Sequence, residues 1–300
     1  MKISRVGNYK TGFKYYKNKV EITNSDEIDK IKLLKIPPAY ENVTIINNKK
    51  IIAYGYDSKN RKQVLYNPKF IAKQNIIKYK KISSSIKFFS KLKKKISRDL
   101  SNTDEKIKAI AIIITLIFTC GFRIGNKKYE KENNSVGLTT LKYNHLKFEN
   151  NKITIDFIGK KGVRNLAYCN HKIINEYLSN KYKITTSKDD YIFTYGINKI
   201  ITSNDVNEYL KKISNYYSDT KTNTIITTKD LRTWNANTLF ITFFKKLRRN
   251  DNNDNNDNRN IEKIIKKAIE MVAEKLHNTY SICKKSYIDP EIIVNIAKSK

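Results

Sequence analysis

The feature that most constrains the fold of this chain is one long apolar run, IKAIAIIITLIFTC, at residues 107–120. The run is too short to cross a bilayer as a helix, which takes about 20 apolar residues. It therefore predicts a helix buried inside the protein. A lysine-rich segment before it carries apolar residues on one helical face, and these are Ile82, Ile86, Phe89 and Ile96.

Residues 1–75 have the pattern of strands rather than helices. Their β-branched and aromatic runs are separated by turn-forming stretches rich in Asn, Asp, Ser and Lys. After them the spacing becomes helical, interrupted by the strands HLKF, ITIDFIG and VRNLAY, which are joined by the turns ENNK and KKG. We expect an α+β chain, with a small β-rich N-terminal domain at 1–75 and a larger, mainly α-helical domain at 76–300. Further helices are expected at about 171–184, 204–217, 229–248 and 261–277.

The cysteines and the chain start indicate a reducing, intracellular compartment. Cys120, Cys169 and Cys283 are odd in number and far apart, which argues against a disulfide framework. The polar start MKISRVGNYK has no apolar signal-peptide core. The low-complexity stretch DNNDNNDNRN at 251–260 lacks the Gly and Glu of a calcium loop, so we expect a solvated loop and no metal site.

The charge balance predicts a polyanionic partner. The chain has 60 Lys+Arg against 28 Asp+Glu, a formal net charge of +32. Nucleic acid is the expected partner. A membrane surface is the alternative, but we find no basic amphipathic helix with a clean apolar face and no lipidation signal. The sequence also lacks a phosphate-binding Gly-rich loop, zinc motifs and clustered carboxylates, so no nucleotide or metal cofactor is expected.

The remaining candidates for chemistry are cations and a tyrosine. In CGFRIGNKKY, Arg123 directly follows the buried helix, and in FIGKKG, Lys160 lies at a hairpin turn. TTKDLRTW places Arg232 in the first turn of a helix, where a cation opposes the helix dipole and so suggests another role. CKKSYIDPE contains Tyr287. Most single cations of so basic a chain are solvated surface charges, and Tyr287 is one of 20 tyrosines. A catalytic role is therefore inferred from these four residues together and not from any one of them.

Together these side chains could break a phosphodiester bond. A tyrosine that attacks phosphorus needs its charge and the non-bridging oxygens stabilised, which planar arginines do in bidentate fashion. A lysine can protonate the departing 5′-oxygen. The bond energy stays in a phosphotyrosine, so no ATP is needed.

The same stretches resemble the short type IB DNA topoisomerases of poxviruses, giant viruses and bacteria. The resemblance covers nearly the whole chain and rests on six motifs in order: KIPPAYENVTI, GYDSKNRKQVLY, FRIGNKKYEKENNSVGLTTLKYNHL, IDFIGKKG, KDLRTW and AEKLHNTYSICKKSYIDPEII. It implies a monomer that closes as a C-shaped clamp on duplex DNA. It also implies that Tyr287 is the nucleophile, that Arg123 and Arg232 stabilise the transition state, and that Lys160 is the general acid.

The resemblance leaves the fifth catalytic residue open. The family usually has His, or in some bacterial members Asn, nine residues before the tyrosine. That position is Asn278 here, while His277 lies ten before, where the family tends to have Gly. We predict Asn278 as the donor and keep His277 as the alternative. The resemblance further implies DNA contacts at Gln63, Tyr66, Lys128 and Tyr129.

Two other functions remain open at this point. A tyrosine recombinase or integrase uses the same Arg-Lys-Arg-Tyr chemistry, but it usually has His three residues before the second Arg, where this chain has Lys229. A non-enzymatic DNA-binding protein would explain the charge but not the ordered catalytic set. For a viral enzyme, the virion or a viral factory is the expected location.

Overall fold

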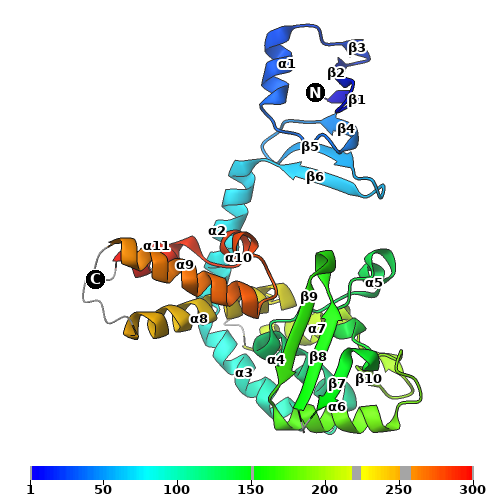
Figure 1. The fold of residues 1–300 in the computed structure, drawn as a ribbon, viewed down its shortest axis with the longest axis vertical. Coiled ribbons are helices and arrows are strands. Elements are labelled where there is room, and N and C mark those ends of the chain that lie inside the picture. The colour runs from blue at the N-terminus through cyan, green and yellow to red at the C-terminus, as the bar shows by residue number, and fades with distance from the viewer. Residues whose placement is uncertain (1, 150–151, 218–223, 251–257, 299–300) are drawn as a thin grey trace. The chain divides into compact units, whose positions relative to one another are not determined.

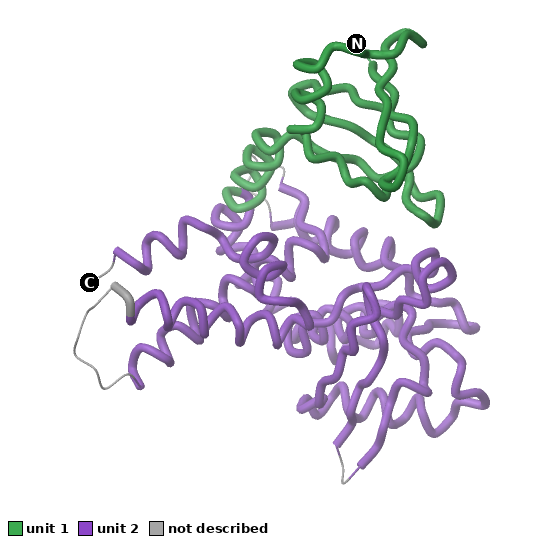
Figure 2. The backbone as a smooth tube through the Cα atoms, turned by 45° about the horizontal axis from the view of Figure 1, so that its top comes forward, with its two compact units in different colours: residues 1–80 green, residues 81–300 purple. Residues whose placement is uncertain are grey.

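The computed structural model divides into two compact units, residues 1–80 and 81–300 (Figure 2). The division falls within helix α2, Pro68–Ser84, which also contains the boundary predicted at residues 75 and 76. Most of the predicted loop at 251–260 lies outside the described residues. The structure describes residues 2–149, 152–217, 224–250 and 258–298.

Across residues 2–80, the first unit contains an antiparallel six-stranded sheet in the order β3-β2-β1-β4-β5-β6 (Figure 1). The strands alternate as a half-buried sheet requires: in β4, Val43 and Ile45 are buried whereas Thr44 between them is half-buried. The predicted β-rich N-terminal part is confirmed. The strands are β1 Ile3–Asn8, β2 Gly12–Lys17, β3 Val20–Glu21, β4 Glu41–Ile45, β5 Ile51–Tyr56 and β6 Lys62–Tyr66.

A short helix in this unit was not predicted. Helix α1, Ser25–Lys32, begins where the side chain of Asn24 accepts a hydrogen bond from the Glu27 backbone N–H at 2.9 Å. Its Ile31 is buried in the core of the unit. The prediction of strands throughout residues 1–75 is therefore wrong here, because Asn24 followed by acidic residues is a helix start.

The second unit is built around α4, Glu105–Cys120, the buried helix predicted from the apolar run. Asp104 caps it by accepting from the N–H groups of Lys106 and Ile107 at 2.8 and 3.0 Å. Residues 109–114 are all buried, because α4 packs against the helices α3 (Ile86–Asp99), α7 (Ser203–Tyr217) and α8 (Thr228–Arg249). This helix fixes the segment that follows it.

The other elements of the second unit confirm the predicted mainly helical composition, but the short hairpin of Thr194–Tyr195 with Lys199–Ile200 was not predicted. The predicted strands form the sheet β7-β8-β9, and the four expected helices appear as α6, α7, α8 and α9. The elements are α3 Ile86–Asp99, α5 Lys127–Asn133, β7 Leu146–Glu149, β8 Lys152–Ile158, β9 Arg164–Cys169, α6 Lys172–Ile184, β10 Thr194–Tyr195, β11 Lys199–Ile200, α7 Ser203–Tyr217, α8 Thr228–Arg249, α9 Asn258–Lys275, α10 Tyr280–Ser286 and α11 Pro290–Lys298.

The last four helices share a hydrophobic core of their own. Phe240 of α8 and Ile269 of α9 are fully buried in it, together with Cys283 of α10 and Ile288. Figure 1 shows α8, α9 and α11 side by side, with α10 against them. This packing brings Tyr287, at the end of α10, onto the helix that carries Arg232.

Three further properties of the described residues bear on function. No helix among them is long and apolar enough to cross a membrane. The same residues contain no group of three or more His, Cys, Asp or Glu side chains placed to hold a metal ion. Cys120, Cys169 and Cys283 are all buried free thiols.

Candidate active site

The segment after α4 lies against the end of α9. Gly121 ends α4 in the left-handed conformation, with φ of +68°. A Cβ at Gly121 would lie 2.1 Å from the Lys275 carbonyl oxygen, so glycine is required on both counts. Arg123 follows two residues later, and its carbonyl accepts from the Leu138 N–H at 2.9 Å. The predicted position of Arg123, on a rigid anchor after the buried helix, therefore matches the structure.

Arg232 is held by these same two segments. Its guanidinium donates from Nη1 to the Gly121 carbonyl and from Nη2 to the Leu276 carbonyl at 3.2 Å. Only 4% of Arg232 is exposed. Its Nε is buried and has no hydrogen-bond partner within the described parts of the chain. A buried N–H donor without a partner is unfavourable in the free protein and is available for an anion.

The sequence placed Arg232 slightly too early in its helix. Helix α8 begins at Thr228 after the cap Thr227, so Arg232 is its fifth residue and lies just beyond the first turn. The helix dipole therefore acts only weakly on Arg232, because its effect falls off within the first turn. Burial lowers the pKa of Arg232, the interaction with Tyr287 raises it, and the nearby charge of Arg123 lowers it further.

Asn278 is the partner of the other arginine. Arg123 Nη2 donates to Asn278 Oδ1 at 2.5 Å. The other end of the amide, Nδ2, is buried and without a partner in the described residues. Arg123 thus orients the amide so that its donor end stays unused. Asn278 Nδ2 and Arg232 Nε are two unpartnered donors beside one tyrosine-bearing segment.

Tyr287 follows directly after α10 and is half-buried. The Arg232 guanidinium carbon lies 5.5 Å from the centre of its ring. Burial alone would raise the pKa of the Tyr287 phenol, but the charges of Arg232 and Arg123 outweigh it, and the pKa lies below its ordinary value. A tyrosine whose anion is favoured in this way is suited to be a nucleophile.

Lys160 lies in the exposed turn Lys160–Gly162 between β8 and β9, as the sequence predicted. Its charge is a further, smaller contribution that lowers the pKa of Tyr287, so it belongs to the same electrostatic environment. Unlike Arg232, it is solvent-exposed.

His277 uses its imidazole within the protein. Its Nε2 lies 2.9 Å from the Cys120 carbonyl oxygen, and its ring stacks on Phe122 with 5.3 Å between the ring centres. The pKa of His277 lies below its ordinary value because of burial and of the positive charges of Arg232 and Arg123. The Nε2–H group of the neutral ring therefore donates to the Cys120 carbonyl and is not left unpartnered for a ligand.

The predicted DNA-contacting residues are not part of this cluster. Gln63 lies in the first unit, where it donates to Asp57 at 3.0 Å, and Tyr66 is partly exposed on β6. Lys128 and Tyr129 lie in the first turn of α5 with exposed side chains.

One residue at the site was missed by sequence reasoning. Asn237 is buried in α8, five residues after Arg232. Its Nδ2 donates to the Tyr287 carbonyl at 2.9 Å and its Oδ1 accepts from the Asp289 N–H at 2.8 Å. Asn237 therefore holds the backbone on both sides of Ile288 and fixes the turn that carries the tyrosine. An amide among apolar residues of a helix was the available signal.

For the DNA cleavage that the sequence resemblance implies, we expect Asn237→Ala to slow the reaction roughly 10-fold, because a displaced reacting group slows catalysis even without a lost contact to substrate. The measurement is single-turnover cleavage of a short duplex, compared with equilibrium DNA binding. Asn237→Asp keeps the acceptor for Asp289 but loses the donor, and should be impaired as well. Unchanged cleavage by both variants would contradict this role.

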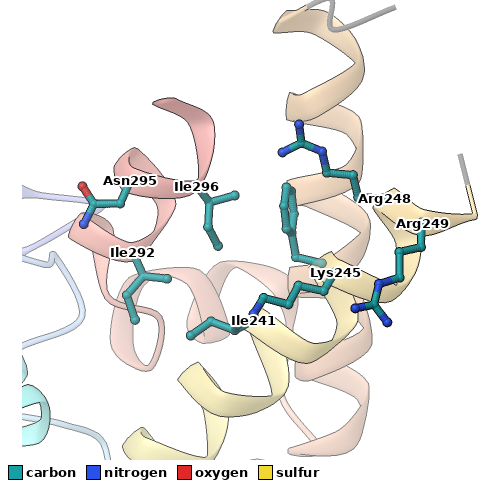
Figure 3. Close-up of a pocket in the computed structure, with 8 residues that line it drawn as sticks. Ile241, Lys245, Arg248, Arg249, Ile292, Asn295 and Ile296 are labelled. Carbon is teal, nitrogen blue, oxygen red and sulfur yellow. The ribbon is translucent and has the colours of Figure 1, made fainter. Parts of the chain in front are cut away.

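A groove of about 780 Å³ opens elsewhere on the second unit, between α8 and α11 (Figure 3). None of the predicted catalytic residues lines it, so it is separate from the candidate active site. Its lining residues are Ile241, Phe244, Lys245, Arg248, Arg249, Ile292, Asn295 and Ile296.

Tyr287, Arg123 and Arg232 come together as the resemblance in the sequence implies. The family profile described as eukaryotic DNA topoisomerase I, catalytic core, matches residues 67–298. The profile of the bacterial DNA topoisomerase IB N-terminal domain matches residues 12–57. The chain therefore belongs to the type IB DNA topoisomerase family.

Individual relatives agree with this assignment. The chain is 32% identical over 282 residues to the DNA topoisomerase 1B of Acanthamoeba polyphaga mimivirus, which covers 91% of this chain and 81% of that protein. It is 26% identical over 253 residues to DNA topoisomerase 1B of vaccinia virus (strain Copenhagen), covering 81% and 72%. The resemblance seen in the sequence is thus confirmed, and the relatives are viral proteins.

Solved structures of a site-specific recombinase are also similar. The XerH recombinase bound to its difH substrate, in a pre-cleavage complex, has a TM-score of 0.38 and 15% identity over 82% of this chain and 59% of the recombinase. The post-cleavage complex with palindromic difH gives 0.40 and 16%, over 74% and 51%. The chain thus spans little more than half of each recombinase chain.

Proposed function

We propose that this chain relaxes supercoiled duplex DNA as a type IB topoisomerase, through a transient 3′-phosphotyrosyl bond at Tyr287 and without ATP or metal. The observation that carries the proposal is the pair of buried, unpartnered donors, Arg232 Nε and Asn278 Nδ2. Arg232 lies against the Tyr287 ring, and Asn278, nine residues before Tyr287, is bonded to Arg123. A phosphate with two non-bridging oxygens is the ligand that such donors fit.

The reaction has two steps, DNA cleavage and religation, and the second is the chemical reverse of the first. The Tyr287 oxygen attacks a backbone phosphorus, its proton passes to solvent, and a tyrosine–phosphorus bond forms while the bond to the 5′-oxygen breaks. Arg123 and Arg232 neutralise the non-bridging oxygens, and Lys160 protonates the departing 5′-oxygen. The downstream duplex then rotates. Afterwards the 5′-hydroxyl attacks the same phosphorus, its proton returns to Lys160, and the tyrosine leaves.

The basic charge of +32 supports duplex DNA as the partner. We further propose that the protein acts as a monomer, with both units on the DNA as a clamp. Gln63 and Tyr66 would contact DNA from the first unit, and Lys128 and Tyr129 from α5. The three buried free thiols fit a reducing intracellular compartment, and viral relatives favour a virion or viral factory.

The test is relaxation of supercoiled plasmid with EDTA present and ATP absent. We expect relaxation of both positive and negative supercoils on plasmids that share no particular site. A DNA-binding protein without enzymatic activity would leave the plasmid supercoiled. A recombinase would act only on substrates with two specific sites and would yield recombined products.

We expect Asn278→Ala to lower the cleavage rate roughly 10²-fold, the usual effect of losing one donor to a transition-state oxygen. DNA affinity should change little, because phosphate contacts elsewhere dominate it. Single-turnover cleavage and equilibrium binding measure the two effects separately. Asn278→Asp is the matched variant: it keeps the acceptor for Arg123 but replaces the unpartnered donor by an oxygen, and should be at least as slow. Cleavage close to the wild-type rate in both variants would contradict the assignment.

A further inference from the structure

We propose that His277 is a positioning residue of the active site, whose imidazole braces the segment 276–278 against the segment 120–123. Both segments bind the guanidinium groups of the two arginines: the Asn278 side chain accepts from Arg123, and the Gly121 and Leu276 carbonyls accept from Arg232. The inference deepens the proposed function and rests on it. It assigns His277 a task different from the donor role of Asn278.

The two segments face one another residue by residue. Arg232 bridges them through the carbonyls of Gly121 and Leu276. One residue before Gly121, the Cys120 carbonyl is 2.9 Å from His277 Nε2. One residue after it, the Phe122 ring stacks on the His277 ring. The His277 contacts thus lie directly beside the anchor of Arg232.

At their last residues, the two segments are joined by the hydrogen bond from Arg123 Nη2 to Asn278 Oδ1 at 2.5 Å. Asn278 is the next residue after His277, so rotation of the backbone at 277 moves its amide. Movement in the other direction displaces the Leu276 carbonyl and with it Arg232. The His277 contacts therefore restrain both Asn278 Nδ2 and the buried guanidinium of Arg232.

The backbone conformation at His277 is itself unfavourable for a non-glycine residue, so side-chain contacts are needed to stabilise it. Its φ is +51°, in the left-handed region, and the residue ends the α9 helix, where its N–H donates to the Glu274 carbonyl at 3.0 Å. A side chain with a Cβ is less favourable than glycine in this conformation. The hydrogen bond to Cys120 and the ring contact with Phe122 offset this preference. The imidazole therefore stabilises a turn that its own Cβ disfavours.

The protonation state follows from the geometry. A carbonyl partner requires a proton on Nε2, which the neutral Nε2–H tautomer supplies. The charged groups that act on the ring are Arg232 of α8, Arg123 after α4, and Lys275 of α9, all positive. A second proton on the ring is therefore disfavoured in the folded protein. With a folded pKa below the unfolded value, His277 lowers folded-state stability as the pH falls through about 6.5.

The test compares three substitutions in the full-length enzyme. His277→Gly removes the imidazole but suits the left-handed backbone, His277→Ala removes the imidazole and keeps the Cβ, and His277→Gln keeps an N–H donor of similar reach. The measurements are single-turnover cleavage and equilibrium affinity for one duplex, and thermal unfolding at about pH 7.5 and 5.5. The wild type and Asn278→Ala are measured alongside.

We expect His277→Gly to cleave about fivefold more slowly than the wild type at unchanged DNA affinity, the effect of one lost neutral hydrogen bond. His277→Ala should be slower still, and His277→Gln should recover part of the rate. The wild type should lose more thermal stability between the two pH values than His277→Gly does, because only the wild type carries the imidazole.

A glycine variant that cleaves as fast as the wild type would overturn the inference while leaving the proposed function intact. So would a loss near 10²-fold at position 277 with normal cleavage by Asn278→Ala, since His277 would then be the donor itself. Equal pH dependence of unfolding in the wild type and the glycine variant would contradict the brace. A wild-type enzyme that fails to cleave would instead overturn the proposed function, and with it the positioning role.

Discussion

Tyr287→Phe is expected to bind duplex DNA with the affinity of the wild type and to form no covalent complex that survives SDS. The substitution removes only the hydroxyl, so the ring that lies near Arg232 remains in place. Without the oxygen no tyrosine–phosphorus bond can form, and no other group of the cluster is a nucleophile of this kind. Gel separation of protein-linked DNA, together with plasmid relaxation, measures the effect.

Tyr280→Phe is the matched control, because Tyr280 begins the same helix α10 and packs in the same core. It should relax plasmid normally. If Tyr287→Phe relaxed plasmid at the wild-type rate, the nucleophile would have to be another residue. If it lost DNA binding as well, its failure to cleave would reflect lost affinity rather than a lost nucleophile.

Lys160→Ala is expected to slow cleavage of ordinary DNA roughly 10³-fold, within the range for loss of a general acid. The 5′-oxygen is a poor leaving group unless it is protonated as the bond breaks. Replacing the bridging 5′-oxygen by sulfur gives a leaving group that departs without a proton. The Lys160→Ala enzyme should therefore cleave the sulfur-containing substrate nearly as fast as the wild type does.

The neighbouring Lys161 supplies the control, and the structure dictates how to change it. Lys161 has φ of +64°, so alanine would add backbone strain, whereas glycine removes the charge without it. Lys161→Gly should cleave both substrates at close to the wild-type rate. Equal slowing of Lys160→Ala on oxygen and sulfur substrates would assign Lys160 to phosphate binding instead of proton transfer.

The sequence was most informative where local pattern decides structure. The apolar run at 107–120 predicted the buried helix α4, and the strands around FIGKKG predicted the β8–β9 hairpin with Lys160 at its turn. Both signals come from neighbouring residues along the chain. Helix α1 gave the weaker signal of one cap and an acidic first turn, over only eight residues.

The geometry of the candidate site depends on contacts that no local pattern contains. Arg123 meets Asn278 across a sequence separation of 155 residues, and His277 meets Cys120 across 157. The nine-residue spacing from Tyr287 selected Asn278, but it could not show that His277 occupies a left-handed turn and bonds a carbonyl. Nor could it show that Asn237 holds the tyrosine-bearing turn, because its partners, the Tyr287 carbonyl and the Asp289 N–H, lie 50 and 52 residues further along the chain.

The most direct test of the account is to identify the residue and the DNA end in the trapped covalent complex. A duplex that releases a short strand after cleavage traps the complex with EDTA present, and digestion then yields the modified peptide for mass spectrometry. We predict a nucleotide 3′-phosphate on Tyr287 and a free 5′-hydroxyl on the released strand. A modification on another residue, or a linkage to the 5′-end of the DNA, would contradict it.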